Sequence, residues 1–182
     1  METRVLSTPE LSYFGSWACA ALRALIGITK DTSDVGKLAK GLNPPISQDE
    51  ARSALGILKQ LGLVVPDGNG GWNITDQIIS TGGEVKSQAV RDFHRHTLEL
   101  AQESIDRHKP EERDISSVVF TADESDLPEI RHRIEEFRRG LLQFARQSER
   151  ADRVYALNIA MFPLSDKVDD PDTGAAPQNR GA

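Results

Sequence analysis

Residues 38–75, LAKGLNPPISQDEARSALGILKQLGLVVPDGNGGWNIT, constrain the fold of this chain more than any other stretch. They combine a short helix, a Pro-containing turn, a longer amphipathic helix and two extended segments around a Gly-rich tip. This order is typical of a helix-turn-helix followed by a wing, a shape that can lay one helix in the major groove of DNA. The pattern predicts the fold, while the charges on its surface decide whether it can bind DNA.

Local signals mark the ends of these elements. Asp34 is expected to cap the short helix, and Ser47 with Glu50 forms a capping box at the start of the longer one. The longer helix is expected over Ser47–Leu61, with one buried stripe made of Ala51, Ala54, Leu55, Leu58 and Leu61. The turn Asp67–Gly71 is expected to join short strands at Leu63–Val65 and Trp72–Thr75.

A helix is also expected before this region, from Thr8 to Gly27. Thr8 and Pro9 form a start signal, and apolar residues recur at helical spacing: Leu11, Phe14, Ala18, Ala21, Leu22 and Leu25. Cys19 lies beside this stripe and is expected to be a small buried residue, because no activating neighbour is visible. It is the single cysteine of the chain, so no internal disulfide can form, which is typical of a reducing compartment.

The second half has a different pattern. A long helix is expected over Ser87–Lys109, a strand over Asp114–Thr121, and another helix after a capping box at Asp126 and Glu129. Apolar residues follow this box at spacings of 3 and 4, as Leu127, Ile130, Ile134, Phe137, Leu141 and Phe144. Val154–Phe162 is expected to be a strand that is buried on both faces. The predicted class is α+β: a winged helix-turn-helix domain at residues 1–80, a hinge near residues 80–83, an α-β-α-β dimerisation domain at residues 81–164 and a disordered tail at residues 165–182.

Two strands alone make a marginal sheet, because three or more are usually needed for independent stability. Pairing two copies edge to edge would give four strands, so we expect a homodimer. Its predicted interface residues are Val119, Leu127, Ile134, Phe137, Leu141, Leu157 and Ile159. The alternative is that both strands join the wing or pack under the long helix within one chain.

Several strings resemble one bacterial family. They are LGLV at 61–64, STGGEVKSQAVRDFHRHTLELA at 80–101, RDISSVVF at 113–120, LPEIRHRIEEFRRGLLQFA at 127–145 and VYALNIAMFPLS at 154–165. This family is described as a winged-helix-like domain of unknown function, and its members are sometimes labelled transcriptional regulators. The resemblance implies a winged helix fused to a dimerising α/β segment, with no established activity. Family members usually carry an extra N-terminal helical region, so this chain is expected to be a short member or a fragment.

No catalytic pattern stands out. The four histidines, His94, His96, His108 and His132, include no pair four residues apart and no HExxH motif. No GxSxG motif is present, and the Gly-rich tip lacks the Lys-Ser/Thr of a phosphate-binding loop. We therefore expect no enzyme, no cofactor and no metal site.

Duplex DNA is the expected partner, although the charges are mixed. Residues 1–80 carry seven basic and eight acidic side chains, a net charge of −1, and the whole chain has a net charge of −6. The candidate DNA contacts are Lys37, Lys40, Gln48, Arg52, Ser53 and Lys59. Asp49 and Glu50 oppose this reading because carboxylates near phosphates weaken binding. The wing tip also lacks the Lys or Arg that usually grips the DNA backbone.

Two functions from different classes remain. The first is a homodimeric transcriptional regulator that binds DNA through its winged helix. The second is a protein–protein interaction module in which the winged helix has lost its DNA contacts and docks a partner through the acidic helix. We expect a cytoplasmic protein, because the start METRVLSTPE has no signal-peptide pattern and no apolar run could span a membrane.

Overall fold

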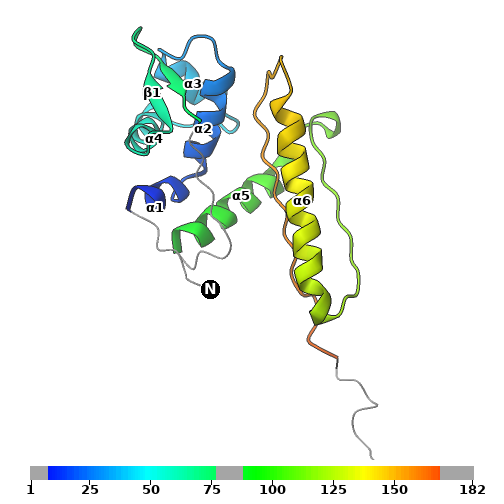
Figure 1. Ribbon diagram of the computed structural model, residues 1–182. Helices are drawn as coiled ribbons and strands as arrows, with labels where there is room; N and C mark the ends of the chain where they lie inside the picture. The colour runs from blue at the N-terminus through cyan, green and yellow to red at the C-terminus, as the bar shows by residue number, and fades with distance from the viewer. Residues whose placement is uncertain (1–7, 77–87, 169–182) are drawn as a thin grey trace, which may run out of the picture.

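The computed structural model describes residues 8–76 and 88–168 (Figure 1). Residues 8–76 form a lobe of four helices and a β-hairpin, called the N-terminal lobe below. Residues 108–168, called the C-terminal arm, contain one long helix flanked by extended chain. Figure 1 shows helix α5, Gln88–Arg107, lying between these two parts. The predicted hinge at 80–83 and the tail beyond residue 168 lie outside the described residues.

The N-terminal lobe begins with two helices where the sequence predicted one. They are α1, Thr8–Phe14, and α2, Trp17–Ile28. The expectation of a single helix is wrong because Ser16 starts a new one: its backbone is extended, and its hydroxyl oxygen accepts the Ala18 N–H at 3.2 Å. The apolar spacing continues across this break, so it does not reveal the break.

Two further helices follow, α3 at Val35–Gly41 and α4 at Gln48–Gln60. The side chain of Asp34 accepts the Lys37 N–H at 3.0 Å, which confirms it as the cap of α3. The core between α2, α3, α4 and the hairpin is apolar, and its largest fully buried side chains are Leu22, Leu38, Leu58, Leu63, Val64 and Cys19. Each large side chain contributes about 1.5–3 kcal/mol through burial, so these helices hold α4 in a fixed position.

The hairpin pairs β1, Val64–Pro66, with β2, Trp72–Ile74, in antiparallel register. The carboxylate of Asp67 accepts the backbone N–H groups of Asn69 at 2.7 Å and Gly71 at 2.8 Å, which shapes the tip. Gly68 and Gly70 adopt φ values of 84° and 89°, where side-chain-bearing residues are strained. The predicted strand pair and turn are therefore confirmed.

Helix α5 packs mainly against α1. The rings of Phe14 and Phe93 meet edge to face with centroids 5.8 Å apart, and Val90 is buried in the same region. The prediction of one long helix here is confirmed, with its described start at Gln88. Among the described residues, no helix is long and apolar enough to cross a lipid bilayer.

The C-terminal arm holds two short 3₁₀ turns, η1 at Pro110–Glu112 and η2 at Glu124–Asp126, and the helix α6 at Leu127–Arg146. The predicted capping box of α6 is wrong: Asp126 makes no side-chain cap, and Asp123 instead accepts the Ser125 N–H at 2.8 Å. The strands predicted at 114–121 and 154–162 are not formed in the single chain. Within residues 8–76 and 88–168, neither segment makes a backbone–backbone hydrogen bond or belongs to a sheet.

Candidate functional site

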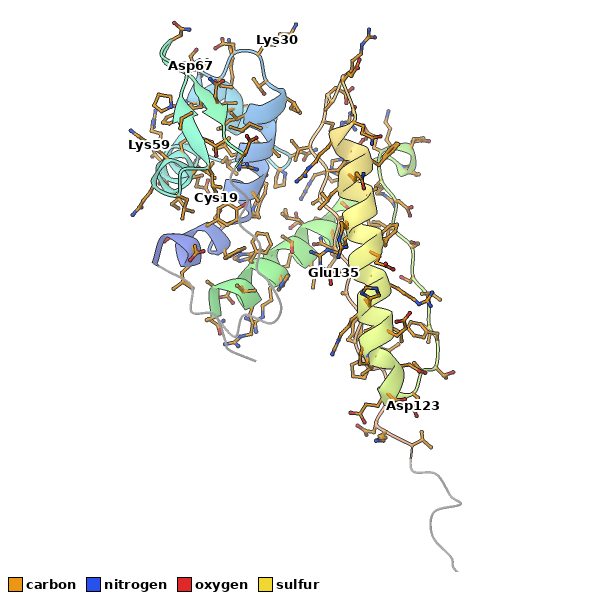
Figure 2. All side chains as sticks on the ribbon, viewed as in Figure 1. Cys19, Lys30, Lys59, Asp67, Asp123 and Glu135 are labelled. Atoms are coloured by element: carbon orange, nitrogen blue, oxygen red, sulfur yellow. The ribbon has the colours of Figure 1, made fainter. Side chains whose placement is uncertain are left out.

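The outward side of α4 is open to solvent. Its inward side chains Ala51, Ala54, Leu55 and Leu58 are buried against the lobe, whereas Gln48, Arg52 and Lys59 are exposed. Arg52 and Lys59 are seven residues apart, which places them on one face two turns from each other. Figure 2 shows Lys59 pointing away from the lobe. The predicted recognition helix therefore presents its outer face instead of sealing it against the fold.

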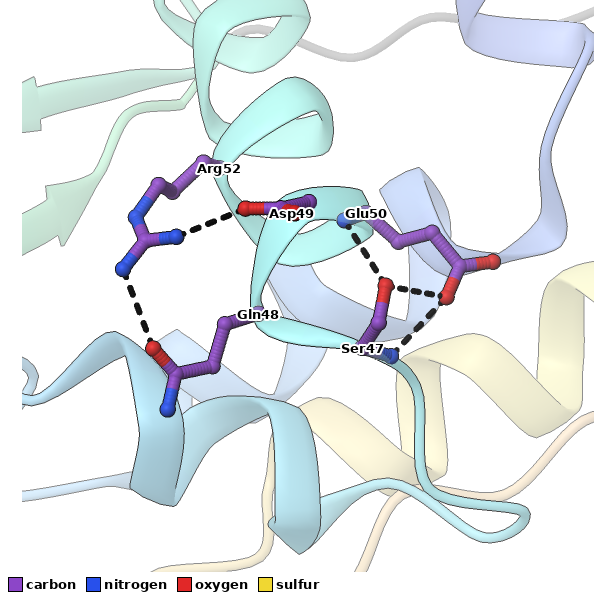
Figure 3. A network of polar contacts seen from close by, with 5 residues as sticks. All are labelled: Ser47, Gln48, Asp49, Glu50 and Arg52. Carbon is purple, nitrogen blue, oxygen red and sulfur yellow. Dashed lines mark hydrogen bonds and ion pairs between the residues drawn. The ribbon is translucent and has the colours of Figure 1, made fainter.

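The start of α4 is organised by a capping box, as predicted (Figure 3). The hydroxyl oxygen of Ser47 accepts the Glu50 N–H at 3.2 Å, and the Glu50 carboxylate accepts the Ser47 N–H at 2.8 Å and its hydroxyl at 2.7 Å. These hydrogen bonds from Ser47 hold the pKa of the Glu50 carboxyl below its ordinary value. Glu50 therefore serves the helix start and keeps its negative charge there.

Arg52 is held by its own helix. Its guanidinium donates to Asp49 at 2.8 Å and to the side-chain oxygen of Gln48 at 3.0 Å (Figure 3). The Arg52 and Asp49 side chains are 58% and 93% exposed, so water screens this ion pair strongly. Exposed pairs of this kind contribute about 0–1 kcal/mol, so Arg52 can exchange Asp49 for another anion at small cost.

Helix α3 meets the start of α4 at Gly36. A Cβ atom on Gly36 would lie 2.9 Å from the side-chain nitrogen of Gln48, so the amide of Gln48 covers this glycine. Lys37 follows Gly36 directly, and Lys40 lies one turn further along α3; both are exposed. The structure thus brings Gln48 and Arg52 together and places Lys37 at the same junction. Within the described residues, no hydrogen bond or ion pair connects Lys40 or Lys59 to this network.

Ser53 lies on another side of α4. It lines an open groove of about 600 Å³ between α4 and α5, together with Ile57, Trp17, Leu100 and His96. The groove also carries the carboxylates of Asp49, Glu50, Glu99 and Glu103, and Glu103 is paired with Arg107. None of the described His, Cys, Asp and Glu side chains gather in a group of three or more that could hold a metal ion. The groove is therefore an acidic rim over an apolar floor.

Sequence reasoning did not single out Lys30, a basic residue near the hairpin. The hydroxyl of Thr32 accepts the Trp72 N–H at 2.7 Å and donates to the Trp72 carbonyl at 2.9 Å, which ties the α2–α3 loop to β2. Lys30 lies in this loop, and Figure 2 shows it at the same end of the lobe as Asp67. The hairpin tip, Asp67–Gly71, has no basic residue, so Lys30 adds a positive charge at that end of the lobe. Its position directly after the predicted helix, in a short loop, was the available signal.

The predicted dimer residues all lie on the C-terminal arm. Leu127 and Ile134 of α6 are half-buried beside the extended segments, whereas the later members Phe137 and Leu141 are exposed. On the extended segments, Val119, Leu157 and Ile159 are exposed as well. The structure therefore places this set on one unit, with most of its members uncovered in the single chain.

Among the described residues, five polar contacts hold the arm together and to α5. Asn158 donates to the Thr97 carbonyl at 2.9 Å, and Arg113 donates to the carbonyls of Ile105, near the end of α5, and of His108, directly after it. Arg153 pairs with Glu112 at 2.9 Å, and Lys167 pairs with Glu124 at 2.9 Å. Sequence reasoning missed all of these residues, because each contact joins segments whose relative placement no local pattern reveals.

Comparison with curated proteins and with solved structures found no match to this chain. A comparison with protein families found one, described as a domain of unknown function, DUF4423, over residues 1–164. That range contains the whole N-terminal lobe, α5 and nearly all of the C-terminal arm. The chain therefore belongs to the DUF4423 family.

Proposed function

We propose that this protein is a DNA-binding transcriptional regulator that acts as a homodimer. In this proposal the N-terminal lobe is a winged helix, α4 is its recognition helix and the β1–β2 hairpin is its wing. The order α2, α3, α4, β1, β2 supports this assignment because a winged helix has the same sequence of elements. The C-terminal arm would join the two copies.

The observation that carries the proposal is the exposed face of α4 with Gln48 and Arg52 side by side near its N-terminal end. The N-terminal residues of a recognition helix are the ones that reach base edges. Arginine pairs with the O6 and N7 atoms of guanine, and glutamine pairs with the N6 and N7 atoms of adenine. Two residues of types that read bases therefore support the assignment of α4 as the recognition helix.

The surrounding cations would contact phosphates. Lys37 and Lys40 on α3, Lys59 on α4 and Lys30 beside the hairpin are all exposed. Lysine contacts to phosphates position a protein on the duplex without reading its sequence. Asp49 competes for Arg52, so we expect modest affinity for nonspecific DNA and a better match where Arg52 finds a guanine.

The test is a titration of the full chain with a labelled 30-base-pair duplex library over a range of potassium chloride concentrations. Arg52→Ala and Lys40→Ala should each weaken binding and lower the slope of log affinity against log salt by about one. Arg150→Ala removes the same charge from the turn after α6 and is the matched control. Unchanged binding in both α3 and α4 variants would remove these residues from any DNA contact.

A second candidate function rests on the groove between α4 and α5. Its acidic rim and apolar floor fit a basic amphipathic helix from another protein. Selection from a displayed peptide library should then enrich basic amphipathic sequences, and Glu99→Gln with Glu103→Gln should abolish that enrichment. Absence of duplex binding together with such enrichment would favour this interaction module over the regulator.

A further inference from the structure

The C-terminal arm has no interior of its own. From residue 108 to residue 168, every described residue is exposed or at most half-buried. A folded domain of about 60 residues normally removes about 60% of its surface from water. Exposed backbone and side chains of this length cannot offset the entropy lost on ordering them. Something else must cover the arm when it is folded.

The uncovered surface is strongly apolar. Val119 is 80% exposed on the first extended segment, Phe144 is 73% exposed on α6, and Tyr155 is 71% exposed on the second segment. Monomeric proteins rarely leave contiguous apolar patches larger than a few hundred Å². The accessible surface of the chain is 14410 Å², against about 8,700 Å² for a compact monomer of this mass. A stable interface needs only about 800 Å² from each partner.

The backbone of the arm is uncovered as well. Residues 114–122 and 154–162 have strand composition, and among the described residues neither segment makes a backbone–backbone hydrogen bond. Each segment of nine residues spans about 30 Å when extended. Helix α6, with 20 residues, is also about 30 Å long. Figure 1 shows both segments running along α6. The two extended segments therefore match each other and α6 in length, and the backbone of both is unpaired.

The two segments run in the same direction. Arg153 and Glu112 pair at one end, and Lys167 and Glu124 pair at the other. Long side chains connect these ends, while no backbone hydrogen bond connects the segments themselves. The two extended segments are therefore parallel but are not hydrogen-bonded neighbours, which is the layout expected when another strand belongs between them.

We propose that a second copy of this chain supplies the missing strands, so that segments 114–122 and 154–162 of both copies form one intermolecular β-sheet covered by the two α6 helices. A two-fold axis perpendicular to the sheet would place segment 154–162 of one copy beside the same segment of the other, in antiparallel orientation. Each copy would then fill the gap between the two strands of its partner. All neighbouring strands in this four-stranded sheet are antiparallel.

Charge favours a second copy over a foreign strand. Segment 154–162, VYALNIAMF, has no charged residue, and segment 114–122 has only Asp114. Self-pairing across a two-fold axis therefore meets no like-charge repulsion, and no charge is offered for recognising a different partner. On α6, Arg133 and Arg139 already pair with Glu129 and Glu135 on the same helix.

This inference rests on the proposed homodimer but not on DNA binding, and the test separates the two. Sedimentation of the full chain at about 20 µM should show a species of about 40 kDa, twice the chain mass of 20.0 kDa. Hydrogen exchange should show amides of 114–122 and 154–162 protected about a hundredfold or more over unpaired chain. Duplex binding is measured on the same samples.

A proline variant isolates the backbone pairing. Ala156→Pro removes one N–H while remaining compatible with extended chain, so it should weaken the dimer about a hundredfold or more. Ala156→Ser keeps the N–H and should retain the dimer. Unfolding of the N-terminal lobe, followed by its tryptophans, reports whether either variant is misfolded.

Each outcome has one meaning. A dimer with unprotected segments, or an Ala156→Pro dimer of unchanged affinity, would overturn the sheet and leave the homodimer standing on another face. Sedimentation as a species of 20.0 kDa at every concentration would overturn both the sheet and the homodimer. Duplex binding by such a monomer would leave the DNA-binding part of the proposed function intact.

Discussion

Asn158 donates its side-chain N–H to the backbone carbonyl of Thr97, 2.9 Å away and 61 positions earlier in the chain. The acceptor lies in the middle of α5, where the carbonyl belongs to a helical turn, and Thr97 is one of the few buried polar residues. Asn158 lies in the middle of the last extended segment. This hydrogen bond therefore fixes the position of the segment along α5.

Replacing Asn158 by leucine should loosen this segment. The loss of one side-chain hydrogen bond costs about 1 kcal/mol, which is about a fivefold change in the population of the undocked segment. Trypsin cleavage after Arg150 and Arg153 should become faster by about that factor. Asn73→Leu, at an exposed position of β2, is the control and should leave the cleavage rate unchanged.

Replacing Thr32 by valine should destabilise the N-terminal lobe. Thr32 is buried, and its hydroxyl both accepts from and donates to the backbone of Trp72. Valine has nearly the same shape but leaves the Trp72 N–H unpaired, so the free energy of unfolding should fall by about 1–3 kcal/mol. Urea denaturation followed by tryptophan fluorescence measures the change. Thr32→Ser keeps the hydroxyl, and an equal loss in that variant would contradict the hydrogen-bond explanation.

The start of α4 was predictable and its surroundings were not, for physical reasons. Ser47 and Glu50 lie within one turn, so the capping box depends only on local sequence. The surface that Ser53 faces depends on where α5 packs, which is set by contacts such as that between Phe14 and Phe93. Nothing near Ser53 in the sequence reports that packing.

The same distinction explains the C-terminal arm. The apolar spacing along α6 correctly predicted a helix at Leu127–Arg146 because helical periodicity is local. Strand formation at 114–121 and 154–162 requires a second backbone, and none of the described residues pairs with either segment. The composition of these segments indicates that they can form strands, while strand pairing depends on a partner.

Lowering the pH should reduce the contribution of Ser47 to the free energy of unfolding. Hydrogen bonds from Ser47 lower the pKa of Glu50 in the folded state below the ordinary value of 4.5. A lowered carboxyl pKa stabilises the fold above about pH 4.5, and this part is lost as pH falls through the lowered pKa. Ser47→Ala should cost about 0.5–2 kcal/mol near pH 7 and less near pH 3.

Urea unfolding at several pH values measures this difference. Ser53→Ala lies on the same helix outside the capping box and is the matched control. A difference between wild type and Ser47→Ala that stays constant from pH 7 to pH 3 would show that Glu50 does not contribute through its charge.

Two glycines should respond to alanine in opposite directions. A Cβ atom at Gly56, on the exposed side of α4, would meet nothing within 4 Å, so Gly56→Ala should raise the free energy of unfolding by about 0.5–1 kcal/mol. A Cβ atom at Gly71 would lie 2.6 Å from both the Asp67 carboxylate and the Thr32 hydroxyl, so Gly71→Ala should destabilise the lobe. Thermal unfolding of the two variants checks the contrast. Stabilisation by both substitutions would contradict the close packing described at Gly71.

Cys19 should be protected from thiol reagents until the N-terminal lobe opens. Its side chain is 0% exposed in the core between α2 and its neighbours, and burial raises the pKa of its thiol to about 11. Only about 0.1% of such a thiol is ionised at pH 8, and the reagent cannot reach it. Labelling with a disulfide reagent at pH 8 should therefore be slow in buffer and rapid in concentrated urea. Ser53→Cys places a second thiol on the exposed side of α4 and should react quickly in buffer. Equal rates at the two positions would show that the lobe opens far more readily than its packing implies.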